Sequence, residues 1–188
     1  HFVCGFEANG GFLLQTDFFR GTKKIAALPT RDAVLPIVLV LAEACSRGVR
    51  IEALFDALPA RYSKASLVKD FPRWISSKII ASVTPARLDS LRMNLDTFNR
   101  TCWAPILSSI ERYFPIAEFG TLMWLDYTDG LRMGFDQGDV IHLRPSGNAD
   151  EFRVYAVSNA QSRADVIAQR VAEDGGIFSQ MRIDMAHS

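Results

Sequence analysis

Four short apolar runs between residues 117 and 157 constrain the fold of this 188-residue chain more than any other feature. Turn-forming residues separate the first three runs, with Asp129-Gly130 in one gap and Gln137-Gly138 in the next. Such Gly-containing pairs between strand-like runs are typical of β-hairpins. We therefore predict a four-stranded antiparallel sheet with strands at residues 117–126, 131–135, 140–143 and 152–157.

Helical periodicity of apolar residues precedes and follows the predicted sheet. Pro105 breaks the longest helical pattern, because proline lacks an N–H group and clashes with the preceding turn. Thr30 and Asp32 suit the start of the first helix, and Gly48 suits its end. We predict an α+β fold with helices at residues 31–47, 51–58, 73–82, 89–114 and 162–173, further strands at 12–14 and 66–70, and a loosely held tail after residue 176.

Composition and charge exclude several functional classes. Lys and Arg total 21 and Asp and Glu total 21, so nothing predicts broad affinity for nucleic acid or for a membrane surface. The apolar stretch 33–45 is too short to span a bilayer, and Pro36 and Glu43 interrupt it. The cysteines are widely spaced, so we expect neither a disulfide framework nor a metal site, and we predict a cytoplasmic protein.

The gap between the last two predicted strands, the 144–150 loop, begins Arg144-Pro145-Ser146-Gly147-Asn148. Gly147 and Asn148 tolerate positive φ, so successive N–H groups can converge on one point, which is a geometry that binds anions. Arg144 supplies a planar fork of donors and Ser146 a hydroxyl, and both suit phosphate oxygens. Two interpretations stay open from these residues alone: an anion-binding loop, or an ordinary turn with a surface arginine.

The 144–150 loop resembles the C-terminal phosphate-binding loop of the α-D-phosphohexomutases, which include phosphomannomutases, phosphoglucomutases and phosphoglucosamine mutases. That loop commonly reads Arg-(Pro/Ala)-Ser-(Gly/Asn)-Thr-x-Pro. Here Asn148 stands at the Thr place, and Asp150 stands at the Pro place with a charge that opposes a phosphate. Arg153, just beyond the loop, is a further candidate. The resemblance implies a phosphate site formed by Arg144, Ser146, Gly147 and Asn148.

A second segment resembles the sugar-recognition loop of the same family, which commonly reads Gly-Glu-x-Ser-Gly-His. Residues 5–11 read Gly-Phe-Glu-Ala-Asn-Gly-Gly, so Glu7 matches the Glu and Asn9 the Ser. A carboxylate accepts hydrogen bonds from two neighbouring hydroxyls, and an amide both donates and accepts. The resemblance implies that Glu7 and Asn9 bind sugar hydroxyls. On their own, the same residues also fit a solvated turn.

The resemblance covers most of residues 1–175. It implies the remainder of an α/β third domain at residues 1–60 and a C-terminal fourth domain at residues 61–188. A catalytic phosphoserine and a Mg²⁺ site would lie in N-terminal domains of the same polypeptide, so we expect no catalytic residue, no metal ligand and no activity in this chain alone. The implied reaction interconverts hexose 1-phosphate and hexose 6-phosphate through a hexose bisphosphate, as an intramolecular phosphotransferase does.

Two alternative functions stay open. The Glu7 loop also resembles that of the phosphoacetylglucosamine mutases, where a His commonly follows. Gly11 replaces this His, which favours mannose or glucose phosphates over the substrates of phosphoacetylglucosamine or phosphoglucosamine mutases. The other alternative is a non-catalytic sugar-phosphate-binding module.

Overall fold

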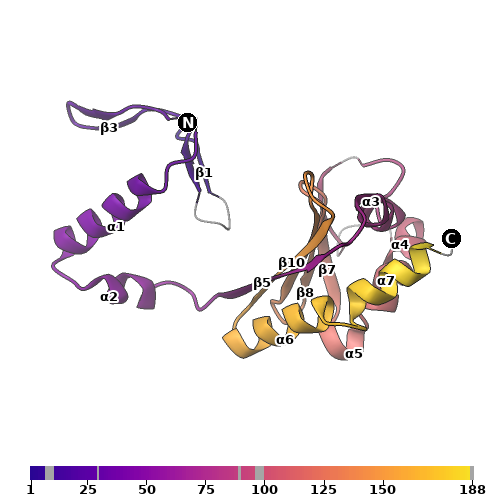
Figure 1. Ribbon diagram of the computed structural model, residues 1–188. Helices are drawn as coiled ribbons and strands as arrows, with labels where there is room; N and C mark the ends of the chain where they lie inside the picture. Colours follow the sequence, from indigo (N-terminus) through magenta and orange to yellow (C-terminus); the bar gives the residue numbers. More distant parts are fainter. Residues whose placement is uncertain (7–10, 29, 89, 96–99, 187–188) are drawn as a thin grey trace. The chain divides into compact units, whose positions relative to one another are not determined.

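The computed structural model describes residues 1–6, 11–28, 30–88, 90–95 and 100–186 (Figure 1). They divide into two units, His1–Pro59 and Ala60–Ser188. The division lies beside the predicted boundary after residue 60. The assignment of the units to the third and fourth domains of a phosphohexomutase stays a prediction.

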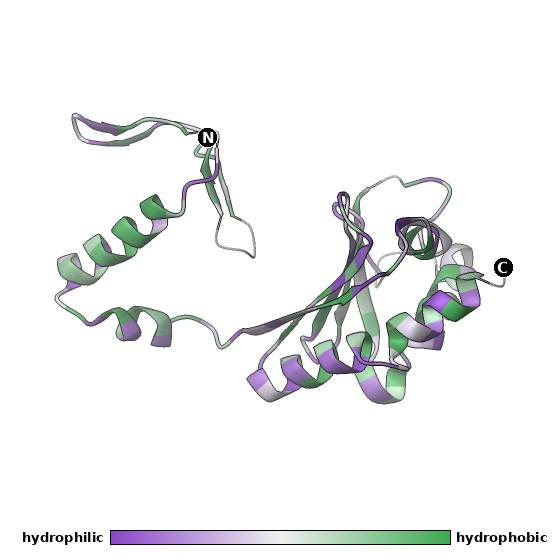
Figure 2. Cartoon of the chain, viewed as in Figure 1, coloured by the Kyte–Doolittle hydropathy of each residue, from purple (hydrophilic) through white to green (hydrophobic). Residues whose placement is uncertain are grey.

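The N-terminal unit has two short antiparallel hairpins followed by two helices. Asp32, which with Thr30 predicted the start of the first helix, accepts hydrogen bonds from the N–H groups of Val34 and Leu35 at 2.8 and 3.1 Å and so caps it. Hydrophobic residues make up most of α1, and the helix ends at Gly48, which has a φ of 63° (Figure 2). The elements are β1 Cys4–Phe6, β2 Phe12–Leu14, β3 Phe18–Arg20, β4 Lys23–Ile25, α1 Val34–Arg47 and α2 Ile51–Asp56.

In the described part of the C-terminal unit, an antiparallel sheet has six strands in the order β5-β10-β9-β8-β7-β6. The four predicted strands correspond to β7, β8, β9 and β10, but the first was predicted too long, because residues 116–119 form the short helix α5 and β7 begins at Leu122. The prediction of four strands was therefore too low, because β5 and β6 add an edge strand on each side. The strands are β5 Tyr62–Lys69, β6 Arg92–Asn94, β7 Leu122–Asp126, β8 Leu131–Phe135, β9 Val140–Pro145 and β10 Glu151–Ser158.

The helix predicted at residues 89–114 was wrong in two respects. β6 replaces its first part, because Met93 pairs with Leu125 of β7 and is buried in the core. α4 (Arg100–Tyr113) then continues through Pro105 without ending there. Burial along one side of α4 outweighs the cost of the proline, through Trp103, Ile110 and Tyr113.

Helices cover one face of the sheet, with α6 and α7 together along it (Figure 1). The predicted loose tail was wrong, because α7 is a helix whose Phe178 stacks on Phe152 with 4.1 Å between ring centroids. The helices of this unit other than α4 are α3 Arg73–Ser82, α5 Ile116–Phe119, α6 Gln161–Ala172 and α7 Ile177–Ala186.

The other face of the sheet carries polar side chains, and we call it the polar face. Residues of β10 alternate between buried and half-buried, as expected when only one face is covered by helices. Residues directly opposite each other on neighbouring strands share a face. Strand register therefore places on the polar face Asp126, Arg132, His142, Tyr155, Arg144 and Arg153.

Candidate functional site

The predicted sugar-binding residues Glu7 and Asn9 lie outside the described residues. The strands that flank them, β1 and β2, are antiparallel partners, with Phe6 opposite Phe12. The role of Glu7 and Asn9 stays a prediction from the sequence.

The 144–150 loop joins β9 to β10 in a tight hairpin. The Ser146 N–H donates to the carbonyl of Glu151 at 3.1 Å, which closes the hairpin. The Ser146 Oγ accepts a hydrogen bond from the N–H of Ala149 at 3.2 Å, so the hydroxyl proton is left to donate elsewhere. The predicted phosphate-binding residues are neighbours in the chain, and they lie at the end of β9 and in the turn that follows it.

Gly147 and Asn148 are exposed within this loop. Neither residue has a positive φ, so the predicted left-handed conformation was wrong. The Ser146 side chain shapes the turn instead, through its bond to Ala149. Among the hydrogen bonds of the described residues, none uses the N–H groups of Gly147 or Asn148. Both N–H groups therefore remain able to donate to a bound anion.

Arg144 is the last residue but one of β9, and two neighbours orient its guanidinium. Its Nε lies 2.7 Å from Oδ2 of Asp129, and it also donates to the hydroxyl of Tyr155. Partial burial would lower the pKa of Arg144, but the hydrogen bond to Tyr155 and the charge of Asp129 outweigh it and raise the pKa. A guanidinium has more donors than these partners use, and its side chain is 41% exposed, so it can still meet an oxyanion.

The turn between β7 and β8 packs directly on β9 beside Arg144. Gly130 has a φ of 87°, and a Cβ there would meet the carbonyl oxygen of Leu143 and lie 3.3 Å from the Cα of Arg144. The carbonyl of Asp129 contacts Nε2 of His142 at 2.5 Å, and Nε2 must donate because a carbonyl only accepts. The close approach that glycine permits therefore brings Asp129, which we predicted only as a turn residue, to Arg144.

Arg153 lies directly opposite Arg144 on the neighbouring strand. Its Nη2 pairs with Oε2 of Glu151 at 2.7 Å, and hydrogen bonds to Glu151 and then Tyr155 raise the pKa of Arg153. Among the described residues, the Nε of Arg153 is the buried side-chain nitrogen or oxygen without a hydrogen-bond partner. Like charges in direct opposition are unfavourable, and Glu151 and Asp129 offset them here.

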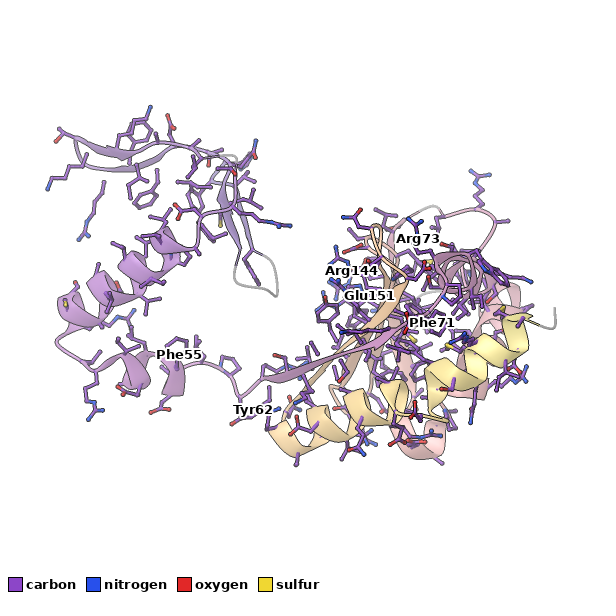
Figure 3. All side chains as sticks on the ribbon, in the orientation of Figure 1. Phe55, Tyr62, Phe71, Arg73, Arg144 and Glu151 are labelled. Atoms are coloured by element: carbon purple, nitrogen blue, oxygen red, sulfur yellow. The ribbon has the colours of Figure 1, made fainter. Side chains whose placement is uncertain are left out.

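Asp150, the expected weak point of the loop, does not pair with Arg153. Its Oδ1 lies 3.4 Å from Nε of Arg73, the first residue of α3, and accepts a hydrogen bond from the Arg73 N–H at 3.2 Å. Figure 3 shows Arg73 at the same end of the sheet as Arg144 and Glu151. No local pattern predicts this contact, because Arg73 and Asp150 are 77 positions apart.

Comparison with curated proteins finds phosphomannomutases. The chain is 35% identical over 169 residues to a phosphomannomutase from Salmonella muenchen, across 90% of this chain and 30% of the relative. It is 29% identical over 171 residues to a phosphomannomutase from Sinorhizobium fredii (strain NBRC 101917 / NGR234), across 90% of this chain and 31% of that relative. The resemblance to the phosphohexomutase family is confirmed.

The chain spans about 30% of the length of these phosphomannomutases, which fits a portion of a phosphohexomutase. A scan against models of protein families finds no match. The similarity to phosphomannomutases therefore rests on the pairwise alignments, which extend far beyond the two loops.

The phosphohexomutase resemblance implies Mg²⁺, but the described residues do not fit a metal site. No three His, Cys, Asp or Glu side chains of the described ranges gather closely enough to hold a metal ion. The acids in and beside the candidate loop are already paired with arginines: Asp129 with Arg144, Asp150 with Arg73 and Glu151 with Arg153. A separate finding concerns membranes: within the described residues, no helix combines the length and the apolar character needed to cross a bilayer.

Proposed function

We propose that this chain is the part of a phosphomannomutase-like phosphohexomutase that recognises the sugar hydroxyls and the non-reacting phosphate. The observation that carries this proposal is the set of donors on one loop. The oriented guanidinium of Arg144, the Ser146 hydroxyl and the unused N–H groups of Gly147 and Asn148 all belong to one hairpin connection. Charged and neutral N–H donors on one loop suit a tetrahedral phosphate.

The proposed enzyme interconverts hexose 1-phosphate and hexose 6-phosphate through a hexose bisphosphate. Glu7 and Asn9 would bind the hydroxyls in either orientation of the sugar, and the 144–150 loop would bind the phosphate remote from the chemistry. Positioning and charge neutralisation are most of what phosphoryl transfer requires of a protein. We assign the phosphoserine and the Mg²⁺ site to other parts of the polypeptide, and we expect residues 1–188 alone to be inactive. The proposed enzyme acts in the cytoplasm.

Arg153 is the second cationic residue of the proposed site. It shares the polar face with Arg144, directly opposite it, and its buried Nε has no hydrogen-bond partner among the residues that the structure describes. A phosphate between the two guanidinium groups would place a further anion between them, in addition to the carboxylates of Asp129 and Glu151.

The decisive experiment is an NMR titration of residues 1–188, first with inorganic phosphate and then with mannose 6-phosphate. We expect the amide signals of Gly147, Asn148 and Ala149 to shift saturably with both. If those amides stay in place while others move, the proposed site is wrong. Glu7→Ala should weaken the binding of mannose 6-phosphate but leave the binding of inorganic phosphate unchanged.

Activity assays separate the alternative functions. A longer protein that contains the preceding reading frame should be assayed on mannose, glucose and N-acetylglucosamine phosphates. Preference for N-acetylglucosamine phosphates would support a phosphoacetylglucosamine or phosphoglucosamine mutase. Binding without turnover on any of the three sugars would support a non-catalytic module.

A further inference from the structure

Arg73 and Asp150 tie the 144–150 loop to the first turn of α3. Oδ1 of Asp150 accepts a hydrogen bond from the backbone N–H of Arg73 at 3.2 Å and lies 3.4 Å from the side-chain Nε of the same residue. Nη1 of Arg73 donates to the carbonyl of Gly147 at 3.3 Å. One guanidinium therefore bridges Gly147 and the last residue of the loop.

This bridge rests on a packed part of the core. After β5, Asp70 takes a positive φ of 54° and turns the chain toward the loop. The N–H of Phe71 then donates to the carbonyl of Asp150 at 3.0 Å. Phe71 is buried, and its ring centroid lies 5.2 Å from that of Phe152, two residues beyond the loop. Both the carbonyl and the carboxylate of Asp150 are thus fixed by a rigid segment.

Two opposite effects of Asp150 on a phosphate follow from physical chemistry. As a negative charge near the loop, Asp150 repels the anion. As a partner of Arg73, it restricts the conformations of Gly147 and Asn148, which reduces the ordering cost when their N–H groups bind. The repulsion is reduced here, because the charge of Arg73 and the positive end of α3 both face the Asp150 carboxylate.

We propose that Arg73 and Asp150 are positioning residues that hold the 144–150 loop ready for phosphate, so that Asp150 strengthens binding despite its charge. The inference rests on the proposed function of the loop. Asp150 stands where the family's loop commonly has proline. A proline restricts the backbone through its ring, and Asp150 would restrict the loop through its contacts with Arg73 instead.

Asp150→Asn tests the sign of the effect, since it removes the charge and keeps the shape. We expect inorganic phosphate to bind residues 1–188 about three- to tenfold more weakly, measured by NMR titration. Equal or tighter binding would mean that Asp150 acts as a repelling charge, and would overturn the proposal. Arg73→Gln should weaken phosphate binding by a similar factor. The double variant should bind phosphate about as tightly as the single variant with the lower affinity, because the two residues act as one unit.

Asp165→Asn is the matched control, because it removes another exposed acid, on α6, that pairs with Lys64 and not with the loop. Phosphate affinity should stay unchanged in this variant. Nitrogen-15 relaxation without phosphate provides a second readout, which does not depend on the proposed function. Asp150→Asn and Arg73→Gln should each increase the mobility of the Gly147–Ala149 amides. If the wild-type protein binds no phosphate at the loop, the proposed function fails. Unchanged amide mobility in the two variants would separately overturn the positioning role of Arg73 and Asp150.

Discussion

Arg144 and Asp129 form an ion pair, with Nε of the arginine 2.7 Å from Oδ2 of the aspartate. The pair joins the end of β9 to the turn between β7 and β8, so the guanidinium is held from one side before any ligand arrives. The hydroxyl of Tyr155 provides a second contact. Preorganisation of this kind lowers the conformational cost of binding, because the long arginine side chain is already restricted.

Arg144→Lys should weaken the binding of inorganic phosphate by about tenfold or more, because an ammonium cannot replace the two parallel hydrogen bonds of a guanidinium. Isothermal titration calorimetry on residues 1–188 measures this directly. Arg132→Lys is the control, since Arg132 shares the polar face but lies on β8, opposite His142. Equal losses in both variants would indicate a general effect of charge rather than a site at Arg144.

Gly130→Ala should destabilise the C-terminal unit by roughly 1–3 kcal/mol, from backbone strain at a φ of 87° and from contact with the Leu143 carbonyl. It should also weaken phosphate binding, because Asp129 would move away from Arg144. Gly147→Ala is the matched control for stability. A Cβ at Gly147 meets no atom within 4 Å, and the residue has no positive φ. Urea unfolding of the two variants checks the difference, and equal free energies of unfolding would contradict it.

Local signals in the sequence were sufficient for the elements that depend on them. β8 was predicted at residues 131–135 and is found at Leu131–Phe135, because Gly130 and Gly138 supply the positive φ values that end it on both sides. Periodicity alone predicted α3 at its observed bounds, Arg73–Ser82. The composition of the 144–150 loop likewise sufficed to select candidate residues, since they are neighbours in the chain.

Contacts between distant residues were beyond the sequence. β6 is a strand because Met93 meets Leu125 across the sheet, whereas its own neighbours favour a helix. α7 is ordered by the stacking of Phe178 on Phe152, and the glycines before it gave the opposite signal. The partner of Asp150 depends on the register of β5 and β10, which no local pattern specifies.

Arg163→Ala should lower the free energy of unfolding markedly, near the lower end of the roughly 3–5 kcal/mol typical when one partner of a buried ion pair is removed. Asp139 is 3% exposed, and its Oδ2 lies 2.8 Å from Nε of Arg163. The variant would leave this carboxylate buried without a cation. Lys64→Gln is the control, because its ion pair with Asp165 spans 4.0 Å at the surface and should contribute less than about 1 kcal/mol. Denaturant unfolding of both variants measures the two losses. Equal decreases in the free energy of unfolding would refute the distinction between the buried and the surface ion pair.

Tyr113 should make the stability of the C-terminal unit fall at high pH. Burial raises the pKa of Tyr113 from 10.0 to about 12, and its hydrogen bond to Oδ2 of Asp184, at 2.6 Å, adds to the shift. The folded protein therefore keeps the phenol proton to about pH 12, whereas the unfolded chain releases it near pH 10. Since the unfolded state then binds fewer protons, the free energy of unfolding is unaffected below pH 10 and declines as pH rises toward 12.

Tyr113→Phe removes this dependence, so its free energy of unfolding should decline less steeply than that of the wild type between about pH 10 and 11. Urea unfolding at several pH values measures the two slopes. Tyr127, whose pKa burial also raises, is present in both proteins, and its contribution cancels in the comparison. Parallel curves for wild type and variant would mean that Tyr113 ionises equally easily in the folded and unfolded states, contrary to its burial and its contact with the Asp184 carboxylate.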